Sequence, residues 1–425
     1  MVKRTYLKRI ADELLQERLR TSGAVLVEGP KYCGKTATAT KVSKSQLYMQ
    51  DPDKSTSYLM AVDTKPSLLL QGETPRLLDE WQTAPVLWDA VRFMVDNRGG
   101  IPGQFILTGS AVPKDDAVLH TGTGRISRLM MRPMSLFESL ESNGMVSLKS
   151  LFDGKMNIEG FSDLSIENIA SSIIRGGWPT SIGDNDSIAS RHAIDYVEAV
   201  INADISRVDG VEKHPARVRA LMRSYARNIS TMATIKTIHD DIAIGDTNTS
   251  LSEKTISQYL LALDRIFVTE NLPAWNPVLR SKTAIRTSVK RHFVDPSIAT
   301  AVMRLTPSRL LEDFQYFGFL FESLSTRDLR VYAEAIDGQV FHYRDASGLE
   351  SDTVVCLNDG RWAPIEVKLG TKKIEEAAEH LLELKSKVDT RKMKEPSFLM
   401  ILTATEFAYK RDDGVLVVPI GCLKN

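Results

Sequence analysis

The sequence predicts an α/β protein: a parallel sheet with helices on both faces, then a helical connector, then a second α/β domain. Three observations carry this prediction. The apolar run 24–27 leads into a glycine-rich loop and a helix-forming stretch, 37–42. A second apolar run, 76–78, ends in an acidic pair, and an apolar helix near 318–324 precedes a strand, turn and return strand over 351–368. Strands alternating with helices in this way favour layered α/β architecture.

The bulk composition limits the class of protein. A chain of 425 residues is too long for one ordinary core, so two or three domains are expected. The charges of the 54 basic and 54 acidic residues cancel, so the net charge does not favour nucleic-acid binding. Binding through a local basic patch stays open. The sequence contains no run of eighteen apolar residues, so no membrane span is predicted. The N-terminus is charged and lacks the apolar core of a signal peptide. Three cysteines without a CxxC favour a reducing, cytoplasmic setting.

The glycine-rich loop matches the phosphate-binding P-loop pattern G-x-x-x-x-G-K-[ST]. Its glycines allow backbone N–H groups to point at phosphate oxygens, and the following helix adds a partial positive charge. Lys35 is predicted to reach the β- and γ-phosphates of ATP, and the Thr36 hydroxyl to bind Mg²⁺. A chance turn is disfavoured because a strand and a helix flank the loop. The predicted ATP-binding loop comprises Gly29, Pro30, Lys31, Tyr32, Cys33, Gly34, Lys35 and Thr36.

Residues 1–20 are expected to form an amphipathic helix, and 76–80 a strand ending in two acids. In P-loop NTPases the first acid of such a pair holds Mg²⁺ and the second polarises the attacking water. Asp79 and Glu80 are assigned to these two roles. The next strand, 104–110, carries Thr108 and Ser110, which either sense the γ-phosphate or cap the following turn.

An arginine beyond the sheet is expected to stabilise charge on the transferring phosphoryl group. Arg125 is the first candidate and Arg128 the second. Whether the arginine acts within its own subunit or on a neighbour stays open, and a solvated or structural arginine is the alternative.

Four segments in this order, GPKYCGKT, LLDEWQ, FILTGS and GRISRLMMRPMSLFE, resemble a widespread prokaryotic family of AAA-type ATP-binding proteins with a C-terminal domain of unknown function. RPMSLFE resembles the segment that closes the family's ATPase domain, which places that domain at 1–140. The resemblance extends over nearly the whole chain and implies ATP binding and hydrolysis. It implies no known cellular role.

The connector is expected over 141–310. Helices are predicted at 187–209 and 217–231, and a further helix begins after the N-cap candidate Ser252. Together they have the character of a winged helix, with 267–268 and 272–275 as strands of the wing. Such a unit either reads DNA in the major groove or only packs the domain, and the few basic residues of the helix after Ser252 favour packing.

The C-terminal domain, 311–425, holds a second set of candidate residues. Glu322 interrupts an apolar helix, Asp352 lies on a strand, and Glu366 and Lys368 share one face of the return strand. This set and its order of elements resemble the PD-(D/E)xK nucleases. The resemblance implies that Asp352 and Glu366 bind Mg²⁺ and that Lys368 positions water or phosphate. Polar neighbours around Asp352, and the lack of a preceding proline, depart from that pattern.

Two functions follow as hypotheses. In the first, ATP hydrolysis controls a nuclease-like domain that acts on nucleic acid, with DNA as the expected partner. In the second, the chain is a nucleotide-switch ATPase whose C-terminal domain is an inactive module for partner binding or assembly. A homo-oligomer or a protein partner is compatible with both, and neither involves a membrane.

Overall fold

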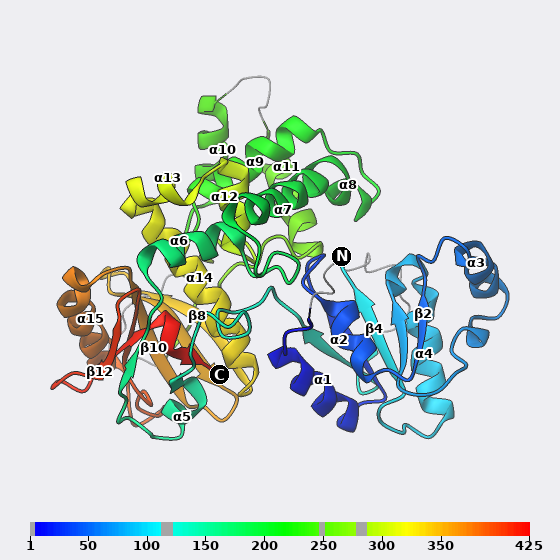
Figure 1. Cartoon of the computed structure of the whole chain (residues 1–425), viewed down its shortest axis with the longest axis horizontal. Helices are drawn as coiled ribbons and strands as arrows, with labels where there is room; N and C mark the ends of the chain where they lie inside the picture. Colours follow the sequence, from blue (N-terminus) through cyan, green and yellow to red (C-terminus); the bar gives the residue numbers. More distant parts are fainter. Residues whose placement is uncertain (1–4, 112–121, 246–250, 278–286) are drawn as a thin grey trace.

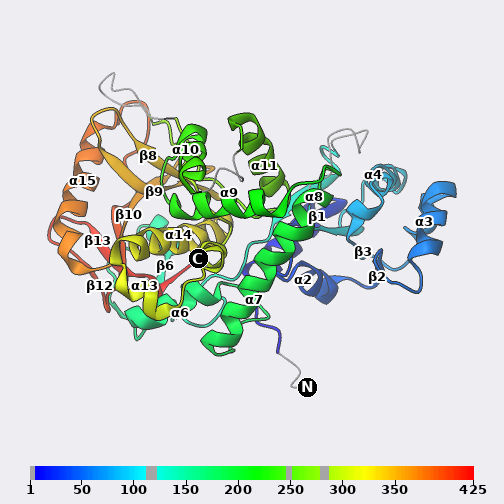
Figure 2. The ribbon, with the colours of Figure 1, turned by 90° about the horizontal axis from the view of Figure 1, so that it is seen from above.

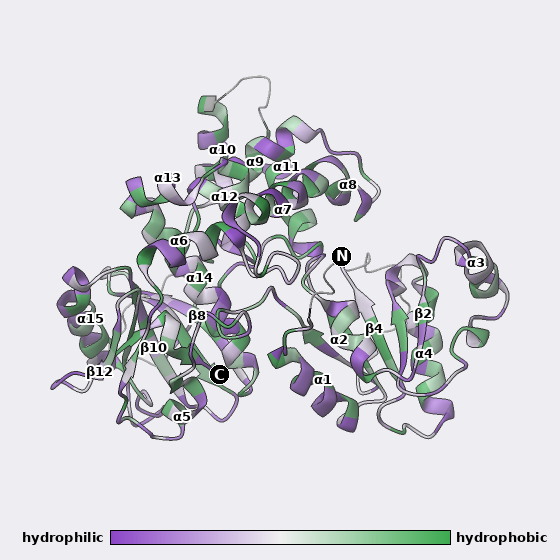
Figure 3. Cartoon of the chain, viewed as in Figure 1, coloured by the Kyte–Doolittle hydropathy of each residue, from purple (hydrophilic) through white to green (hydrophobic). Residues whose placement is uncertain are grey.

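The computed structural model describes residues 5–111, 122–245, 251–277 and 287–425. Two sheets lie side by side beneath a helical connector, with the N-terminal sheet on one side and the C-terminal sheet on the other (Figures 1 and 2). Hydrophobic residues gather on the strands of both sheets, whereas the outer faces of the helices are mixed or hydrophilic (Figure 3). No helix among the described residues is both long enough and apolar enough to cross a membrane.

The N-terminal sheet has five parallel strands in the order β2-β3-β4-β1-β5. Alternate residues of its central strand face opposite layers, because side chains alternate across a strand. Ala24 and Leu26 pack towards α4, and Val25 and Val27 pack towards α1 and α2. The predicted parallel sheet with helices on both faces is therefore confirmed. Its strands are β1 (Ala24–Glu28), β2 (Ser45–Tyr48), β3 (Arg76–Asp79), β4 (Phe105–Gly109) and β5 (Ile126–Met130).

The helices of this unit are α1 (Ile10–Thr21), α2 (Lys35–Val42), α3 (Ser55–Thr64) and α4 (Val86–Asn97). The predicted N-terminal helix thus begins later than residue 1. Arg9 has an extended backbone and serves as the N-cap, with Asp12 accepting from its N–H at 2.9 Å. Helix formation can only start after such a residue.

The middle of the chain is helical, as predicted. Ser252 caps its helix by accepting a hydrogen bond from the Thr255 N–H at 3.2 Å. Between α7 and α8 the chain makes one π-helical turn, Val200–Asp204. The helices are α6 (Ile166–Arg175), α7 (Asp186–Ala199), α8 (Ile205–Arg207), α9 (Pro215–Arg227), α10 (Ile235–Gly245), α11 (Glu253–Arg265), α12 (Pro296–Met303) and α13 (Pro307–Glu312).

The strands expected for a wing are absent from the described part of the connector. Instead, isolated antiparallel bridges join Thr269 to Phe293 and Leu272 to Lys290, and a parallel bridge joins Ala274 to His342. Pro273 lacks an N–H group and cannot continue a ladder on both sides. Its carbonyl accepts from the His342 N–H at 2.9 Å, so this segment ties the connector to the C-terminal domain.

The C-terminal domain is a mixed seven-stranded sheet, ordered β7-β12-β13-β11-β10-β9-β8. The helices α14 (Phe314–Glu334) and α15 (Ile374–Lys387) cover its two faces: Met400 and Leu402 pack towards α14, whereas Leu399 and Ile401 pack towards α15. The strands are β7 (Gly160–Phe161), β8 (Gly338–Arg344), β9 (Glu350–Leu357), β10 (Trp362–Lys368), β11 (Met400–Thr403), β12 (Phe407–Lys410) and β13 (Leu416–Pro419).

A segment that the sequence assigns to the connector pairs with the C-terminal domain. Gly160–Phe161 extends the large sheet beside β12, and β6 (Val146–Ser147) pairs with β14 (Leu423–Lys424). The short helix α5 (Leu148–Phe152) lies between β6 and β7 in the chain. These strands are only two residues long, which is too short for a periodic sequence signal.

Candidate functional site

The P-loop lies between β1 and α2, at the carboxyl end of β1. Gly29 adopts φ 150°, and a Cβ there would lie 2.1 Å from the Met131 carbonyl oxygen, so only glycine fits. Gly34 is the N-cap of α2 in the left-handed region, with φ 103°. Lys35 is buried, and its Nζ donates to the carbonyls of Gly29 at 3.0 Å and Pro30 at 2.7 Å. The lysine thus lies within the curve of its own loop.

Asp79 joins two other predicted site residues. Its Oδ1 accepts from the Thr36 hydroxyl at 2.7 Å and from the Thr108 hydroxyl at 2.5 Å. The strand register explains this, because Asp79 of β3 lies opposite Thr108 of β4 at the sheet edge where the P-loop begins. Hydroxyl and carboxylate oxygens are the ligands that Mg²⁺ prefers, so Thr36 and Asp79 fit the predicted ion.

Glu80 lies next to this group in a strained backbone conformation, with φ 56°. Its carboxylate accepts from the Ser110 hydroxyl at 3.1 Å and from the Gln82 amide. It lines a cleft of about 330 Å³, together with Lys31 and Arg207. A left-handed backbone at a non-glycine residue is uncommon and clusters at functional sites. This placement suits a carboxylate that orients water.

The connector closes over the P-loop. The Lys31 Nζ donates to Asp204 Oδ1 at 2.7 Å, and Asp204 ends the π-helical turn before α8. Arg207, three residues later, lines the same cleft as Glu80. The sequence did not single out either connector residue. The π-helical turn itself, a feature often found at functional sites, is visible only in the structure.

The remaining loop residues have distinct surroundings. Tyr32 has φ 64° and is mostly exposed, and it lines a cleft of about 300 Å³ with Trp178 and Tyr196. Cys33 is buried, and its thiol donates to the Met131 carbonyl at 3.2 Å. Burial and this hydrogen bond favour a packing role for the cysteine.

The structure does not bring Arg125 to the P-loop of its own chain. Arg125 precedes β5, and its carbonyl accepts from the Ala24 N–H, at the amino end of β1. About 13 Å of strand separate this end from the P-loop. Its guanidinium is ion-paired with Asp96 at 2.9 Å. Of the two alternatives left open, action of Arg125 on its own subunit does not fit this position, whereas action on a neighbouring subunit stays a prediction. Arg128 pairs with Glu28 at 2.9 Å.

In the C-terminal domain the four predicted residues converge. Lys368 Nζ lies 2.5 Å from Glu366 Oε2 and 3.1 Å from Asp352 Oδ2. The Val367 N–H also donates to Asp352 Oδ2 at 2.9 Å. Glu322 of α14 reaches the same place through a lysine that the sequence did not single out: Lys290 Nζ lies 2.7 Å from Glu322 Oε1 and 3.5 Å from Asp352 Oδ1.

Burial and the two lysines set the charge states of this cluster. Burial raises the pKa of Glu322 to about 7, although the Lys290 ammonium opposes the shift. Burial and the neighbouring Asp352 carboxylate raise the pKa of Glu366 well above its usual range. Burial acts on Asp352 in the same sense, but Lys368 and Lys290 overcome it and hold its pKa below the usual range. Asp352 is therefore the most firmly ionised carboxylate of the three.

The predicted metal role of Asp352 and Glu366 does not match this arrangement. Over residues 5–111, 122–245, 251–277 and 287–425, no group of three or more His, Cys, Asp and Glu side chains has the geometry of a metal site. The physical reason is that ammonium groups lie between the carboxylates, where a cation would be bound. The Glu366 Oε1 atom is buried without a hydrogen-bond partner in the described structure.

Residues 21–140 match the family model of an AAA domain. The N-terminal unit is an AAA-type P-loop ATPase domain. Residues 166–309 and 317–423 match two models described as domains of unknown function, DUF8612 and DUF4143.

Two relatives are the uncharacterized proteins Rv2008c of Mycobacterium tuberculosis and Mb2031c of Mycobacterium bovis. Each is 24% identical over 374 residues, which cover 85% of this chain and 74% of the mycobacterial protein. Among solved structures, a Walker-type ATPase of Pyrococcus abyssi is 14% identical with a TM-score of 0.42, covering 69% of this chain and 94% of that one. The ORC2 protein of Aeropyrum pernix is 14% identical with a TM-score of 0.29, covering 62% and 86%. Both likenesses are too distant to transfer a function.

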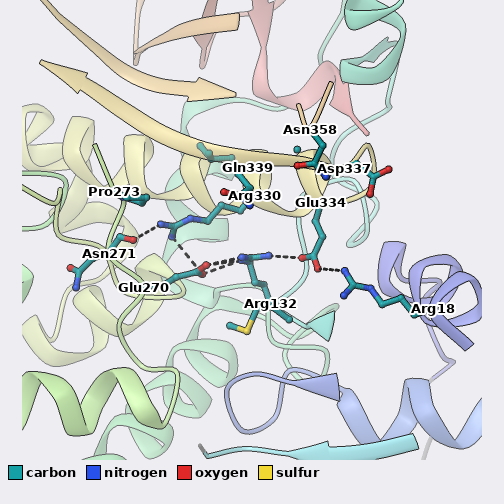
Figure 4. Close-up of a pocket in the computed structure, with 13 residues that line it drawn as sticks. Arg18, Arg132, Glu270, Asn271, Pro273, Arg330, Glu334, Asp337, Gln339 and Asn358 are labelled. Atoms are coloured by element: carbon teal, nitrogen blue, oxygen red, sulfur yellow. Dashed lines mark hydrogen bonds and ion pairs between the residues drawn. The ribbon is translucent and has the colours of Figure 1, made fainter. Parts of the chain in front are cut away.

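The AAA domain meets the rest of the chain through a network of ion pairs around a cavity of about 390 Å³ (Figure 4). Arg132, just after β5, donates to Glu270 of the connector at 2.7 Å and to Glu334 of α14 at 2.9 Å. Arg18 of α1 also donates to Glu334, at 3.1 Å, and Arg330 lies 3.5 Å from Glu270. Three parts of the chain therefore share one charged network.

A buried arginine connects this network to the P-loop. Arg9 donates to the Cys33 carbonyl at 2.7 Å and to the Arg132 carbonyl at 2.8 Å, and its Nε lies 3.0 Å from Glu138. The Arg9 side chain therefore contacts both the P-loop and Arg132, which in turn binds Glu270.

Proposed function

We propose that this protein is an ATPase that binds ATP with Mg²⁺ at residues 29–36 and hydrolyses it. The observation that carries the proposal is the group Thr36, Asp79 and Thr108, joined by hydrogen bonds at the carboxyl edge of the sheet beside Glu80. Thr36 and Asp79 would hold the ion, which would neutralise charge on the β- and γ-phosphates. The match of residues 21–140 to the family model of an AAA domain supports the same conclusion.

The surrounding side chains suggest the order of events. Lys35 now donates to two loop carbonyls, and phosphate oxygens would replace these weaker acceptors when ATP binds. Glu80, held by Ser110 and Gln82, would orient the attacking water. Lys31 and Arg207 bring positive charge to the same cleft, where charge develops in the transition state.

We further propose that the nucleotide state controls the C-terminal domain. The route runs from the Cys33 carbonyl through Arg9 and Arg132 to Glu334. Glu334 lies on α14, the helix that also carries Glu322 twelve residues earlier, about 18 Å along the axis. A rigid helix can transmit a displacement over that distance.

For the C-terminal domain, the candidate activity is metal-dependent cleavage of nucleic acid, with DNA as the expected substrate. Convergence of Glu322, Asp352, Glu366 and Lys368 supports it. The alternative is an inactive module for binding a protein partner or a second copy of the chain. Neutralisation of the carboxylates by two lysines, and the zero net charge of the chain, favour this alternative.

Phosphate release from ATP tests the first proposal. Glu80→Gln should bind ATP as the wild type does but hydrolyse it about 100-fold more slowly, since water activation is lost while binding contacts remain. Lys35→Ala should lose binding itself. Glu17→Gln, an exposed acid of α1, is the matched control and should change neither. Unchanged hydrolysis in both Glu80→Gln and Lys35→Ala would contradict an ATPase at this site.

A further inference from the structure

An ion pair joins the P-loop directly to the connector. Lys31, in the third position of the loop, donates from Nζ to Asp204 Oδ1 at 2.7 Å. Asp204 is the last residue of the π-helical turn Val200–Asp204. Its side chain is only 9% exposed, whereas that of Lys31 is 43% exposed. The carboxylate is therefore held in place by its surroundings, and the flexible lysine is the member of the pair that is free to change partner.

The pair lies where the terminal phosphate of ATP is expected. Lys31 and Asp204 line the same cleft as Glu80, the residue proposed to orient the attacking water. Because water attacks the γ-phosphorus, groups in this cleft beside Glu80 lie on the side of the γ-phosphate. One cation and one anion of the protein therefore lie at the end of the nucleotide that distinguishes ATP from ADP.

The γ-phosphate and Asp204 attract the same ammonium group. Among the residues that the structure describes, Lys31 is the ion-pair partner of Asp204. A buried carboxylate that loses its cation is strongly destabilised. A terminal phosphate carries more negative charge than a carboxylate and offers three acceptor oxygens. Binding of ATP therefore forces a choice on Lys31, whereas ADP brings no acceptor to this end of the site.

A second cation supports an anionic ligand in the cleft. Arg207 lines the cleft three residues after Asp204 and is exposed. Its guanidinium forms no ion pair with the residues that the structure describes, although Asp204 and Glu80 line the same cleft. A guanidinium binds phosphate oxygens with two parallel donors. Arg207 is therefore available to the γ-phosphate together with Lys31.

We propose that Asp204 competes with the γ-phosphate of ATP for Lys31, and that this competition sets the preference of the site for ATP over ADP. The inference rests on the proposed ATP binding at residues 29–36 and adds a specificity-determining residue from the connector. ADP leaves the pair of Lys31 and Asp204 intact. ATP attracts Lys31 to its γ-phosphate, and the same phosphate repels the carboxylate left behind. The end of the π-helical turn is thus bound to the P-loop with ADP and released from it with ATP.

Calorimetric titration of the full chain tests the proposal. The ligands are the Mg²⁺ complexes of ADP and of adenylyl imidodiphosphate, an ATP analogue that is not hydrolysed. The quantity compared is the dissociation constant of ADP divided by that of the analogue. Asp204→Asn removes the competing charge at nearly the same size and should raise this ratio about tenfold or more. Lys31→Met removes the contact with the γ-phosphate and should lower it about tenfold or more. The dissociation constant of ADP should stay within about threefold of the wild-type value in both.

Two exposed residues supply matched controls. Glu212→Gln neutralises an acid of the connector, and Lys44→Met removes a lysine that follows α2. Neither should change the ratio. The combination of Lys31→Met with Asp204→Asn tests the competition itself, because the gain from Asp204→Asn depends on a lysine that is free to bind phosphate. Asp204→Asn should therefore raise the ratio less in the Lys31→Met background than in the wild type.

Equal changes in the affinities for ADP and for the analogue would overturn the proposal, because they would show that the pair only holds the connector against the loop. An equal gain from Asp204→Asn with and without Lys31 would also overturn it. If Lys31→Met is too unstable to bind ADP, the double variant replaces it, since that variant buries no carboxylate without its partner. Its ratio should lie about tenfold or more below that of Asp204→Asn.

The same titrations separate this inference from the proposed ATPase. A wild-type chain that binds neither nucleotide would remove both proposals. Binding of both nucleotides, with a ratio that Asp204→Asn and Lys31→Met leave unchanged, would keep ATP binding at the P-loop and remove the role of Asp204.

Discussion

Arg132 binds the Glu270 carboxylate with two donors, Nη2 at 2.7 Å from Oε1 and Nε at 3.0 Å from Oε2. The two residues belong to different parts of the chain, the end of the AAA domain and the connector. Paired geometry of this kind fixes orientation as well as distance. Arg132 therefore fixes the end of the AAA domain against the connector.

Removing Arg132 should destabilise the chain. Arg132→Ala leaves Glu270 and Glu334 without their main partner in a largely buried place, and losses of one partner in such pairs cost about 3 kcal/mol or more. Urea unfolding measures the loss. Arg20→Ala, on an exposed position of α1, is the control and should have no effect above about 0.5 kcal/mol. Equal stability of both variants would show that the network contributes little.

The pH dependence of stability should report the same contact. Burial alone would raise the pKa of Glu270, but the charges of Arg132 and Arg330 outweigh it and lower that pKa from 4.5 to about 2. A folded pKa below the unfolded value means that the stabilising contribution is complete above pH 4.5 and is lost as the pH falls from 4.5 towards 2. Urea midpoints measured over this range should fall more steeply for the wild type than for Glu270→Gln. Parallel curves would contradict the assigned role of Glu270.

Gly29→Ala should abolish nucleotide binding. The added Cβ would meet the Met131 carbonyl at 2.1 Å, and its φ of 150° disfavours any side chain. Gly318→Ala is the contrasting change, since Gly318 lies within α14 and a Cβ there meets no atom within 4 Å. Alanine should stabilise that helix by about 0.5–1 kcal/mol. Fluorescent-nucleotide binding and thermal unfolding of both variants check the pair of predictions, and ATP binding by Gly29→Ala would refute the close approach.

Arg207 and Arg125 should differ in their effects on hydrolysis. Arg207 lines the cleft that contains Glu80, so Arg207→Ala is expected to slow ATP turnover about tenfold or more. Arg125 lies beside the amino end of β1, away from the P-loop, so Arg125→Ala should slow ATP turnover only if Arg125 reaches a neighbouring subunit. Turnover in mixtures of Arg125→Ala and Lys35→Ala chains decides this. Recovered activity in the mixture indicates action across subunits, and unaffected Arg125→Ala chains indicate none.

Local patterns predicted much of the fold. The P-loop, the strand ending at Asp79 and the hairpin carrying Asp352 and Glu366 are each encoded within a short stretch, where apolar runs and turn residues determine the structure. Asp79 and Thr108 each lie near the end of a predicted strand, and the parallel register places them side by side.

The unpredicted features depend on contacts between distant parts of the chain. Lys290 lies 32 residues before Glu322, and the two side chains meet only because a connector segment packs against α14. Arg132 and Glu270 are 138 residues apart. Such side chains look like ordinary surface charges in the sequence. The position of Arg125 at the amino end of the sheet follows from β5, which begins directly after it and was not among the strands predicted from the sequence.

Hydrogen exchange of backbone amides is the most direct test of the claim that the AAA domain controls the C-terminal cluster. It would be measured for Glu80→Gln, which is expected to bind ATP and to hydrolyse it slowly, with ATP and without nucleotide. If the AAA domain controls the cluster, ATP should change exchange at residues 269–272 and 287–293, and Arg132→Ala in the same background should remove this change. Changes confined to the neighbourhood of residues 29–36 would contradict it.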